Sequence, residues 1–310
     1  MEDIKPIDRA ITPEKHKAWH YKIHPYFTKQ SSNVVKAYIL NYSKKGDTVL
    51  DPFSGSGVTA IESLTERRKA IAVDIAPLSD FITRQTCIAP VDLKLFAEEF
   101  GRLEGRTKSI VEFVRKAKDK EIEDFEIKDW YPKGIKLPAN ADVQYVEDLF
   151  GKRELIVLAR LLKEIKKIEE PKTRNLMLFA FSGILHRASR TYSIDPVQKG
   201  GGDSGIFKVF RYWVPPSPSE RDTWNLFAIR YRIVKRAKQF SNDLIGKFFK
   251  EGDTFRSYVD SATRLSKFIK EHSVDYIYTD PPYGAHIAYL DLSTMWDAWL
   301  GFKIPPQHKQ

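Results

Sequence analysis

Residues 48–74, TVLDPFSGSGVTAIESLTERRKAIAVD, decide the fold of this chain. The short apolar run at 48–50 predicts a buried strand, and the run Ala-Ile-Ala-Val at 70–73 predicts a second one. Between them, a glycine-rich turn at 51–57 leads into 58–67, where apolar residues recur with helical periodicity. A strand, a turn, a helix and a second strand form the opening unit of a doubly wound α/β sheet.

The α/β pattern extends outward from this unit in both directions. An amphipathic helix is predicted upstream at 32–42. Two more strands are predicted near the end of the sequence, at 258–260 and 274–278, with a helix at 262–270 between them. We therefore expect an α/β protein whose sheet has about four strands.

The middle of the sequence has a different, helical pattern. Helical periodicity or a continuous apolar run marks 93–118, 148–169, 176–188 and 224–240. A structureless loop of this length would be unusual, so the region should fold on its own. We expect an α/β core formed by 1–90 and 251–310, interrupted by a mostly helical insertion at 91–250.

Positive charge is concentrated in one part of that insertion. Residues 151–250 contain 21 Lys and Arg against 9 Asp and Glu, a net charge of +12, whereas the whole chain carries +10. A localised basic excess is expected of a surface that binds a polyanion such as nucleic acid. A solvated helical face explains the same charge equally well.

Composition indicates a soluble protein of a reducing cytoplasm. The first 19 residues are charged and contain no apolar signal-peptide core, and no apolar run reaches the roughly 18 residues of a membrane-spanning helix. The single cysteine, Cys87, has neither a disulfide partner nor zinc-ligand spacing, so no metal site is expected.

The glycine-rich turn predicts a nucleoside site. Gly55 and Gly57 would let a ligand approach the backbone, and Asp74, at the end of the next strand, is placed to accept both ribose hydroxyls. Ala60 stands where a dinucleotide site has its third glycine, which leaves room for a smaller ligand such as S-adenosylmethionine. Two glycines are also ordinary turn chemistry.

The tetrapeptide Asp280-Pro281-Pro282-Tyr283 is more specific. Two prolines fix two φ angles and remove two backbone donors, which leaves a rigid edge of outward carbonyls. Such an edge suits a flat amine held by Asp280 and the Pro281 carbonyl, with the Tyr283 ring available to stack on a flipped base. The alternative is a proline turn that closes a strand.

Together these segments resemble the DNA amino-methyltransferases, which modify adenine N6 or cytosine N4. Their cofactor motif, Asp-Pro-Phe-x-Gly-x-Gly, is matched at 51–57, and their catalytic motif is matched at 280–283. The segment 24–29 resembles the one that lines the methionine end of the cofactor, and Asp260 resembles an acidic position near its adenine. The resemblance implies a Rossmann-like S-adenosylmethionine-dependent sheet, with a set of cofactor-binding residues: His24, Lys29, Asp51, Phe53, Gly55, Gly57, Asp74 and Asp260.

The resemblance also implies a function. It makes Asp280, Pro281, Pro282 and Tyr283 catalytic, with adenine favoured over cytosine because Asp is commoner at the first position in adenine enzymes. The insertion then resembles a target-recognition region that binds DNA through its basic residues and through Tyr212, Trp213 and Trp224. An RNA methyltransferase is an open alternative.

Several of these site residues can also be explained by a purely structural role, and the sequence leaves both explanations open. His24 is equally explained as a residue at the entry to a helix, Asp74 as a loop carboxylate, Asp260 as a helix N-cap, and the aromatics at 212 and 213 as core residues.

The resemblance predicts more of the sheet than this sequence supplies. Methyltransferase sheets have seven strands, and four are predicted here, so the sheet is incomplete and its fourth strand would be an exposed apolar edge. Either the chain is a fragment, or a second polypeptide completes the sheet, or the chain is a non-catalytic DNA-binding remnant.

Overall fold

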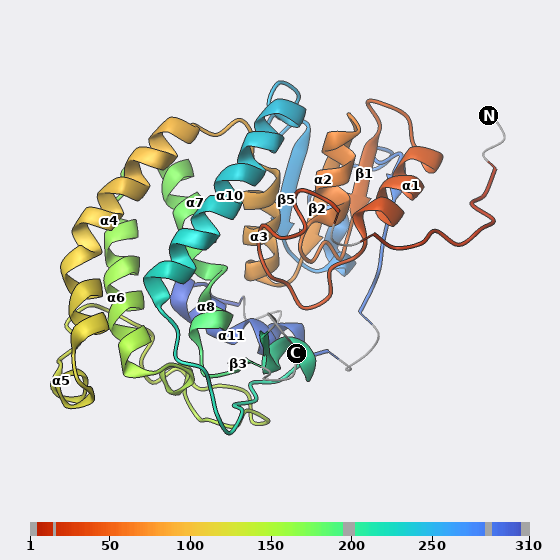
Figure 1. Ribbon diagram of the computed structural model, residues 1–310. Helices are drawn as coiled ribbons and strands as arrows, with labels where there is room; N and C mark the ends of the chain where they lie inside the picture. The colour runs from red at the N-terminus through yellow and green to blue at the C-terminus, as the bar shows by residue number, and fades with distance from the viewer. Residues whose placement is uncertain (1–4, 15–16, 195–201, 283–286, 305–310) are drawn as a thin grey trace. The chain divides into compact units, whose positions relative to one another are not determined.

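The computed structural model describes residues 5–14, 17–194, 202–282 and 287–304. The chain forms two compact units (Figure 1). Unit 1 comprises Met1–Val91, Arg236–Ile287 and Lys303–Gln310, and unit 2 comprises Asp92–Lys235 and Ala288–Phe302.

The limits of the units differ from the predicted division at residue 91 and in two longer segments. Residues 236–250 belong to unit 1, and 288–302 belong to unit 2. The chain passes from unit 2 to unit 1 inside one helix, α10 (Thr223–Ile245). Helical periodicity continues through this point, so the sequence pattern contains no signal of the boundary.

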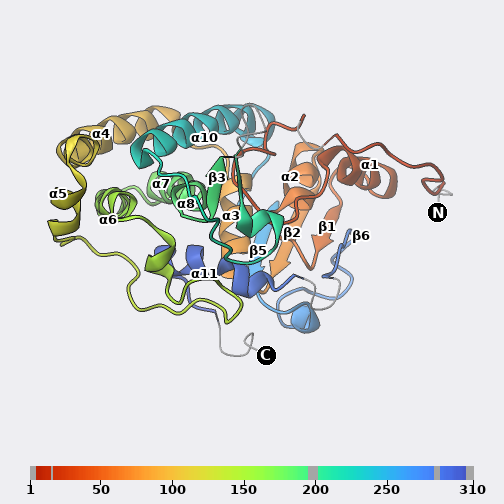
Figure 2. The same ribbon diagram turned by 60° about the horizontal axis from the view of Figure 1, so that its bottom comes forward.

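Unit 1 contains a four-stranded parallel sheet in the order β5-β2-β1-β6 (Figure 2). This sheet and the helices that cover it confirm the predicted α/β class. Its strands are β1 (Thr48–Asp51), β2 (Lys69–Asp74), β5 (Phe255–Val259) and β6 (Tyr276–Ile277).

Each face of the sheet is covered by a different set of elements. On one face, Val49 packs with α1 (Ser32–Tyr42), and Ala72 packs with α2 (Val58–Thr65) and the end of α3 (Pro77–Cys87). The register places Leu50 beside Ile71, which puts both on the opposite face. That face is covered by the segment containing η2 (Ala262–Lys267), through Leu265 and Phe268.

The predicted elements of unit 1 are largely confirmed, with one error and one omission. The helix expected at 262–270 is wrong: this stretch is a short 3₁₀ turn over Ala262–Lys267, with non-helical φ at Arg264. Helix α3 was not predicted, because its buried residues include Ser79, Thr83 and Thr86, which give no apolar stripe. Its buried face mixes these polar residues with Leu78, Ile82 and Cys87.

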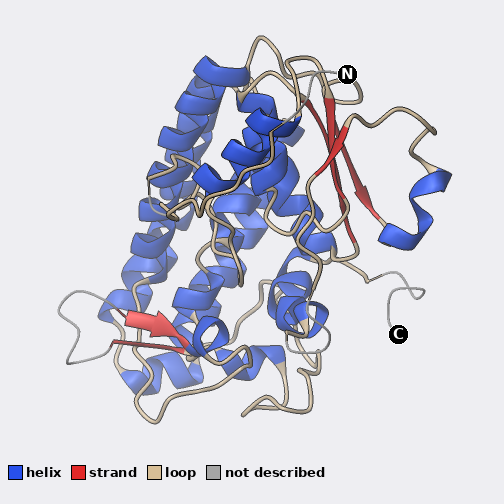
Figure 3. Ribbon diagram, turned by 90° about the vertical axis from the view of Figure 1, so that its right-hand side faces the viewer, coloured by secondary structure: helices blue, strands red, loops and turns tan. Residues whose placement is uncertain are grey.

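Unit 2 is mostly helical (Figure 3). Its longest helix, α4, packs on α6 and α7, and α11 packs on α7. The elements are α4 (Leu93–Lys116), α5 (Asp119–Asp124), η1 (Val146–Leu149), α6 (Lys152–Lys166), α7 (Pro171–Ser182), α8 (Leu185–Ala188), β3 (Tyr192–Ile194), β4 (Gly202–Ser204), α9 (Gly205–Lys208), the first part of α10, and α11 (Tyr289–Leu300). None of the helices in the described part of the chain combines the length and apolarity needed to span a bilayer.

Two aromatics expected to contact DNA are core residues instead. The Tyr212 hydroxyl, which is buried, donates to the Leu292 carbonyl and accepts from the Met295 N–H. Trp224 is also buried and stacks on Phe100. Because periodicity does not distinguish an aromatic at a binding surface from one in a core, only packing decided their role.

Candidate cofactor and catalytic site

Four predicted acidic residues follow the four strands of the sheet at the same edge. Asp51 and Asp74 end β1 and β2, Asp260 follows β5, and Asp280 lies shortly after β6. All four strands are parallel, so their carboxyl ends meet at one edge, which is where open α/β sheets bind ligands. The structure therefore brings the predicted cofactor turn and the Asp-Pro-Pro segment to a common edge.

The two glycines of the turn have backbone conformations that other residues rarely adopt. Gly55 has φ +49° and Gly57 has φ +78°. A Cβ at Gly55 would lie 3.1 Å from the Tyr26 ring, and one at Gly57 would lie 2.7 Å from Thr83 Oγ1. Both glycines are thus required by the protein's own packing, in addition to any contact with a ligand.

The Asp74 carboxylate holds the turn in place. Its Oδ2 accepts the Gly55 N–H at 2.8 Å, and its Oδ1 accepts the Ala76 N–H at 2.9 Å. Burial raises the pKa of Asp74 to about 6, against these hydrogen bonds. Each carboxylate oxygen can accept a second bond, so Asp74 retains acceptor capacity for the predicted ribose hydroxyls.

Asp51 lies between the two predicted subsites. Its Oδ1 accepts the Phe53 N–H at 3.0 Å. Burial raises the pKa of Asp51 to about 7, and the negative charges of Asp74 and Asp280 act in the same direction. A buried carboxyl whose pKa is raised by burial and by neighbouring acids is a candidate functional group.

The segment 24–30 packs against the cofactor turn. Besides its contact with Gly55, the hydroxyl of Tyr26 forms a 2.8 Å hydrogen bond with Ser79 Oγ of α3. The sequence analysis did not single out Tyr26. Its position inside the 24–29 segment was the only sequence feature that pointed to the cofactor turn. His24 is buried, and its Nδ1 donates to the Pro25 carbonyl at 2.7 Å.

Two further predicted cofactor residues are engaged with the protein itself. Lys29 Nζ donates to the Tyr21 carbonyl at 2.9 Å. The Asp260 carboxylate binds the Arg264 guanidinium through both oxygens, at 2.7 and 2.8 Å, and its backbone N–H donates to the Asp74 carbonyl. The structure places Asp260 beside Asp74 at the sheet edge, and its contact with an adenine stays a prediction.

The Asp-Pro-Pro segment is exposed. The Tyr278 N–H donates to the Leu50 carbonyl, which fixes the chain just before Asp280. The side chains of Asp280, Pro281 and Pro282 are exposed, as expected for an edge that receives a substrate. The fourth predicted catalytic residue, Tyr283, lies outside the described residues.

Two observations fit a polar ligand at the glycine turn. The hydroxyl of Ser54 is buried and has no partner among the described residues. The helix that follows, α2, has Gly57 as its N-cap and no side-chain cap, so its first N–H groups are available to a ligand's acceptors. These features and the Asp74 carboxylate suit a nucleoside with a charged polar tail.

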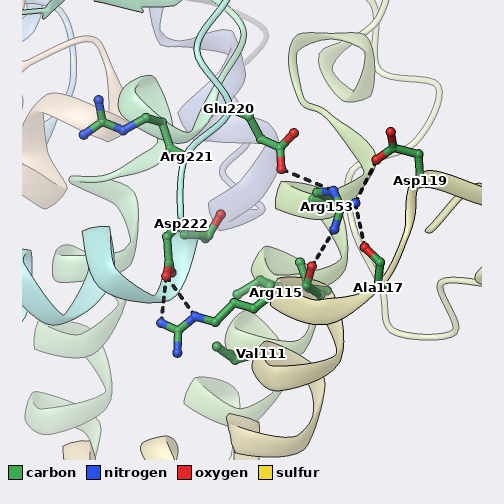
Figure 4. Close-up of a pocket in the computed structure, with 11 residues that line it drawn as sticks. Val111, Arg115, Ala117, Asp119, Arg153, Glu220, Arg221 and Asp222 are labelled. Carbon is green, nitrogen blue, oxygen red and sulfur yellow. Dashed lines mark hydrogen bonds and ion pairs between the residues drawn. The ribbon is translucent and has the colours of Figure 1, made fainter. Parts of the chain in front are cut away.

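A pocket of about 330 Å³ in unit 2 has a different character (Figure 4). The Arg115 guanidinium pairs with Asp222 at 2.7 Å, and that of Arg153 contacts Asp119 and Glu220. These arginines are already neutralised by carboxylates, so the pocket does not resemble an anion site.

Comparison with known proteins finds similarity to DNA methyltransferases. Residues 7–78 match the N6/N4 methyltransferase family model, described as DNA methylase. The type II methyltransferase M.MvaI of Kocuria varians is 23% identical over 271 residues, which are 84% of this chain and 52% of that protein. The type II methyltransferase M.MjaII of Methanocaldococcus jannaschii is 32% identical over 73 residues, 23% of this chain and 14% of that protein. Over these segments the chain is similar to the DNA amino-methyltransferases.

The match covers a defined part of the site. The family model spans the cofactor turn, Asp74 and the 24–30 segment, and it ends before the Asp-Pro-Pro segment. The longer of the two alignments spans about half the length of M.MvaI (52%). For this DNA amino-methyltransferase homologue, the activity and the roles of single residues are therefore proposals.

Proposed function

We propose that this chain transfers a methyl group from S-adenosylmethionine to an exocyclic amine of a base in DNA, with adenine N6 favoured over cytosine N4. One observation carries the proposal. Strand β1 lies between β2 and β6, which brings the glycine turn and Asp280 to one edge of the sheet. A methyl donor bound at the first would face an amine bound at the second.

The residues of the turn hold the cofactor. When bound, S-adenosylmethionine supplies the methyl group from its sulfonium, and its sulfur keeps the electron pair of the broken bond. Asp74 would accept hydrogen bonds from the ribose hydroxyls, and the first N–H groups of α2 would be available to its polar tail. Asp51, Phe53, Gly55 and Gly57 shape the turn around it.

The Asp-Pro-Pro segment holds the target. An exocyclic amine is a poor nucleophile because its lone pair is delocalised into the base ring. Asp280 and the Pro281 carbonyl accept its hydrogens, which favours an sp³ nitrogen whose lone pair points at the methyl group. The lone pair forms the new N–C bond, and the surplus amine proton leaves to solvent. Tyr283 stacks on the flipped base.

The test is methyl transfer to DNA, followed by mass spectrometry of the nucleosides. N6-methyladenine is the expected product, and N4-methylcytosine alone would refute the preference for adenine. An RNA substrate is assayed in parallel, and methylation of RNA only would refute the DNA substrate.

Asp280→Ala is the matching active-site variant. It should lower kcat roughly a hundredfold or more, because its contact strengthens as the amine becomes sp³ and cationic. Cofactor affinity measured by calorimetry should stay at the wild-type value. Near-normal turnover of Asp280→Ala would mean that the segment is only a turn.

The open edge of the sheet favours a second candidate, a DNA-binding subunit that is inactive alone. In the described part of the chain β6 pairs on one side only, with β1, and Ile277 on it is 54% exposed. Such an edge suits pairing with a strand of another polypeptide. This candidate predicts salt-sensitive DNA binding without methyl transfer, and wild-type transfer by the chain alone would exclude it.

A further inference from the structure

A side-chain contact joins Asp280 to a residue 250 positions earlier in the sequence. Gln30 Nε2 donates to Asp280 Oδ2 at 2.5 Å. Both residues belong to unit 1, and Gln30 directly follows the 24–29 segment that packs on the cofactor turn. The same stretch of chain therefore reaches both predicted subsites.

The chemistry of the pair fixes the orientation of the Gln30 amide. An ionised carboxylate only accepts hydrogen bonds, so the amide nitrogen must face Asp280 and the amide oxygen must point away. That oxygen, Gln30 Oε1, is buried and has no partner in the part of the chain that the structure describes.

The unpaired oxygen argues against a purely structural role. Buried acceptors in a stable core are normally paired, so a glutamine retained for packing alone would have both ends satisfied. Here one end of Gln30 binds the proposed catalytic carboxylate and the other is left open beside it. That pattern is expected where a ligand completes the hydrogen bonding.

We propose that Gln30 is the positioning residue for Asp280. The proposal rests on the function proposed above. Asp280 is an exposed side chain with two rotatable bonds, and a hydrogen bond to one of its oxygens restricts how the carboxylate meets the target amine. The amide holds Oδ2 of the carboxylate, which supplies orientation before the reaction begins.

Two substitutions separate this role from simple packing. Gln30→Met keeps the length of the side chain and removes the donor, so kcat should fall roughly 10- to 100-fold while cofactor affinity stays unchanged. Gln30→Glu keeps the shape but faces Asp280 with a second carboxylate, which can bond to the first only by sharing a proton. Its kcat should therefore fall steeply as pH rises, unlike that of the wild type.

The charged surroundings and a control make these readouts specific. The titratable groups that interact electrostatically with Asp280 include Asp51 and Tyr278. Both groups are present in all the variants, so they do not account for a difference between pH profiles. The control is Gln239→Met, which removes a similar glutamine-to-aspartate hydrogen bond, with Asp243 on α10, away from the sheet edge. It should leave kcat unchanged. Weakened cofactor binding with normal kcat in Gln30→Met, or a wild-type pH profile in Gln30→Glu, would overturn the proposal.

A readout independent of activity distinguishes this proposal from the proposed function. The side-chain amide resonances of Gln30 are assigned by their loss in Gln30→Met, and they should shift in Asp280→Ala. If the wild-type chain transfers no methyl group, the proposed function fails, while a shifted amide still supports the anchoring of Asp280. Unshifted resonances overturn the anchoring in either case.

Discussion

At the scale of single residues, neighbouring side chains determine how much a substitution of each glycine should cost in stability. Gly46 and Gly57 both have positive φ, at +92° and +78°. A Cβ at Gly46 would meet nothing within 4 Å, whereas one at Gly57 would lie 2.7–3.0 Å from Thr83. The two positions separate backbone strain from crowding.

Gly57→Ala should be clearly more destabilising than Gly46→Ala. Strain at positive φ costs about 1–2 kcal/mol at either site. Crowding against Thr83 adds about 1–3 kcal/mol at Gly57 alone. Thermal or urea unfolding of the two variants measures the difference. Equal losses of stability would show that Thr83 does not restrict the turn.

Asp74 also has two roles that can be separated by experiment. Asp74→Ala should weaken S-adenosylmethionine binding by about 1.5–3 kcal/mol, because a charged acceptor of two hydroxyls is removed. It should also destabilise the turn, since the Gly55 and Ala76 N–H groups lose their partner. Calorimetry with the folded variant measures the first effect, and Asp253→Asn, an exposed carboxylate near Lys69, is the control. An unchanged dissociation constant would remove Asp74 from the cofactor site.

At the scale of elements, one buried lysine joins two helices of unit 1. Lys238 lies in α10, and its Nζ donates to the Thr86 and Ile88 carbonyls at the end of α3, both at 2.9 Å. Burial lowers the pKa of Lys238 from its usual 10.5 to about 7. The amine can donate these bonds in its neutral form.

This lysine predicts a pH dependence of stability. Between about pH 7 and 10.5 the unfolded chain holds a proton that the folded chain has released, so Lys238 contributes an unfolding free energy that rises with pH in this window. Below pH 7 the contribution is at its lowest. Urea unfolding at pH 7 and 9 should show that the unfolding free energy of the wild type increases relative to that of Lys238→Met. The control, Lys247→Met, lies at an exposed position just beyond the end of α10, and its unfolding free energy should change with pH as that of the wild type does. A parallel change in all three proteins would contradict the assignment.

At the scale of the whole molecule, the basic excess at 151–250 includes exposed side chains. Arg187, Arg190 and Lys208 are exposed in unit 2. The rings of the preceding residues, His186 and Phe207, are 5.2 Å apart, so α8 and α9 lie close together. We expect these exposed basic side chains to contact DNA phosphates.

Replacing Arg187 and Lys208 with Ala should weaken DNA binding at every sequence. The slope of log K against log salt should become shallower by about 0.9 for each phosphate that the variant no longer neutralises. Fluorescence anisotropy at several salt concentrations measures it. Lys163→Ala is the control, because its Nζ is already paired with Asp129 at 2.6 Å. A wild-type slope in the double variant would place the DNA surface elsewhere.

The sequence by itself determined the α/β class of unit 1 and indicated the residues of its candidate site. Strands β1 and β2 and helices α1 and α2 were predictable because their apolar spacing reflects local geometry. The turn and the Asp-Pro-Pro segment were recognisable because glycine and proline restrict the backbone in ways that few other residues do.

Only the tertiary structure decided which distant residues meet. It placed Tyr26 on Gly55, Thr83 on Gly57 and Gln30 on Asp280, and it buried Tyr212 instead of presenting it to DNA. None of these pairings leaves a periodic signal, because each joins segments far apart in the chain through single contacts. Local propensity acts within a few residues, whereas such contacts exist only after the sheet has brought its strand ends to one edge.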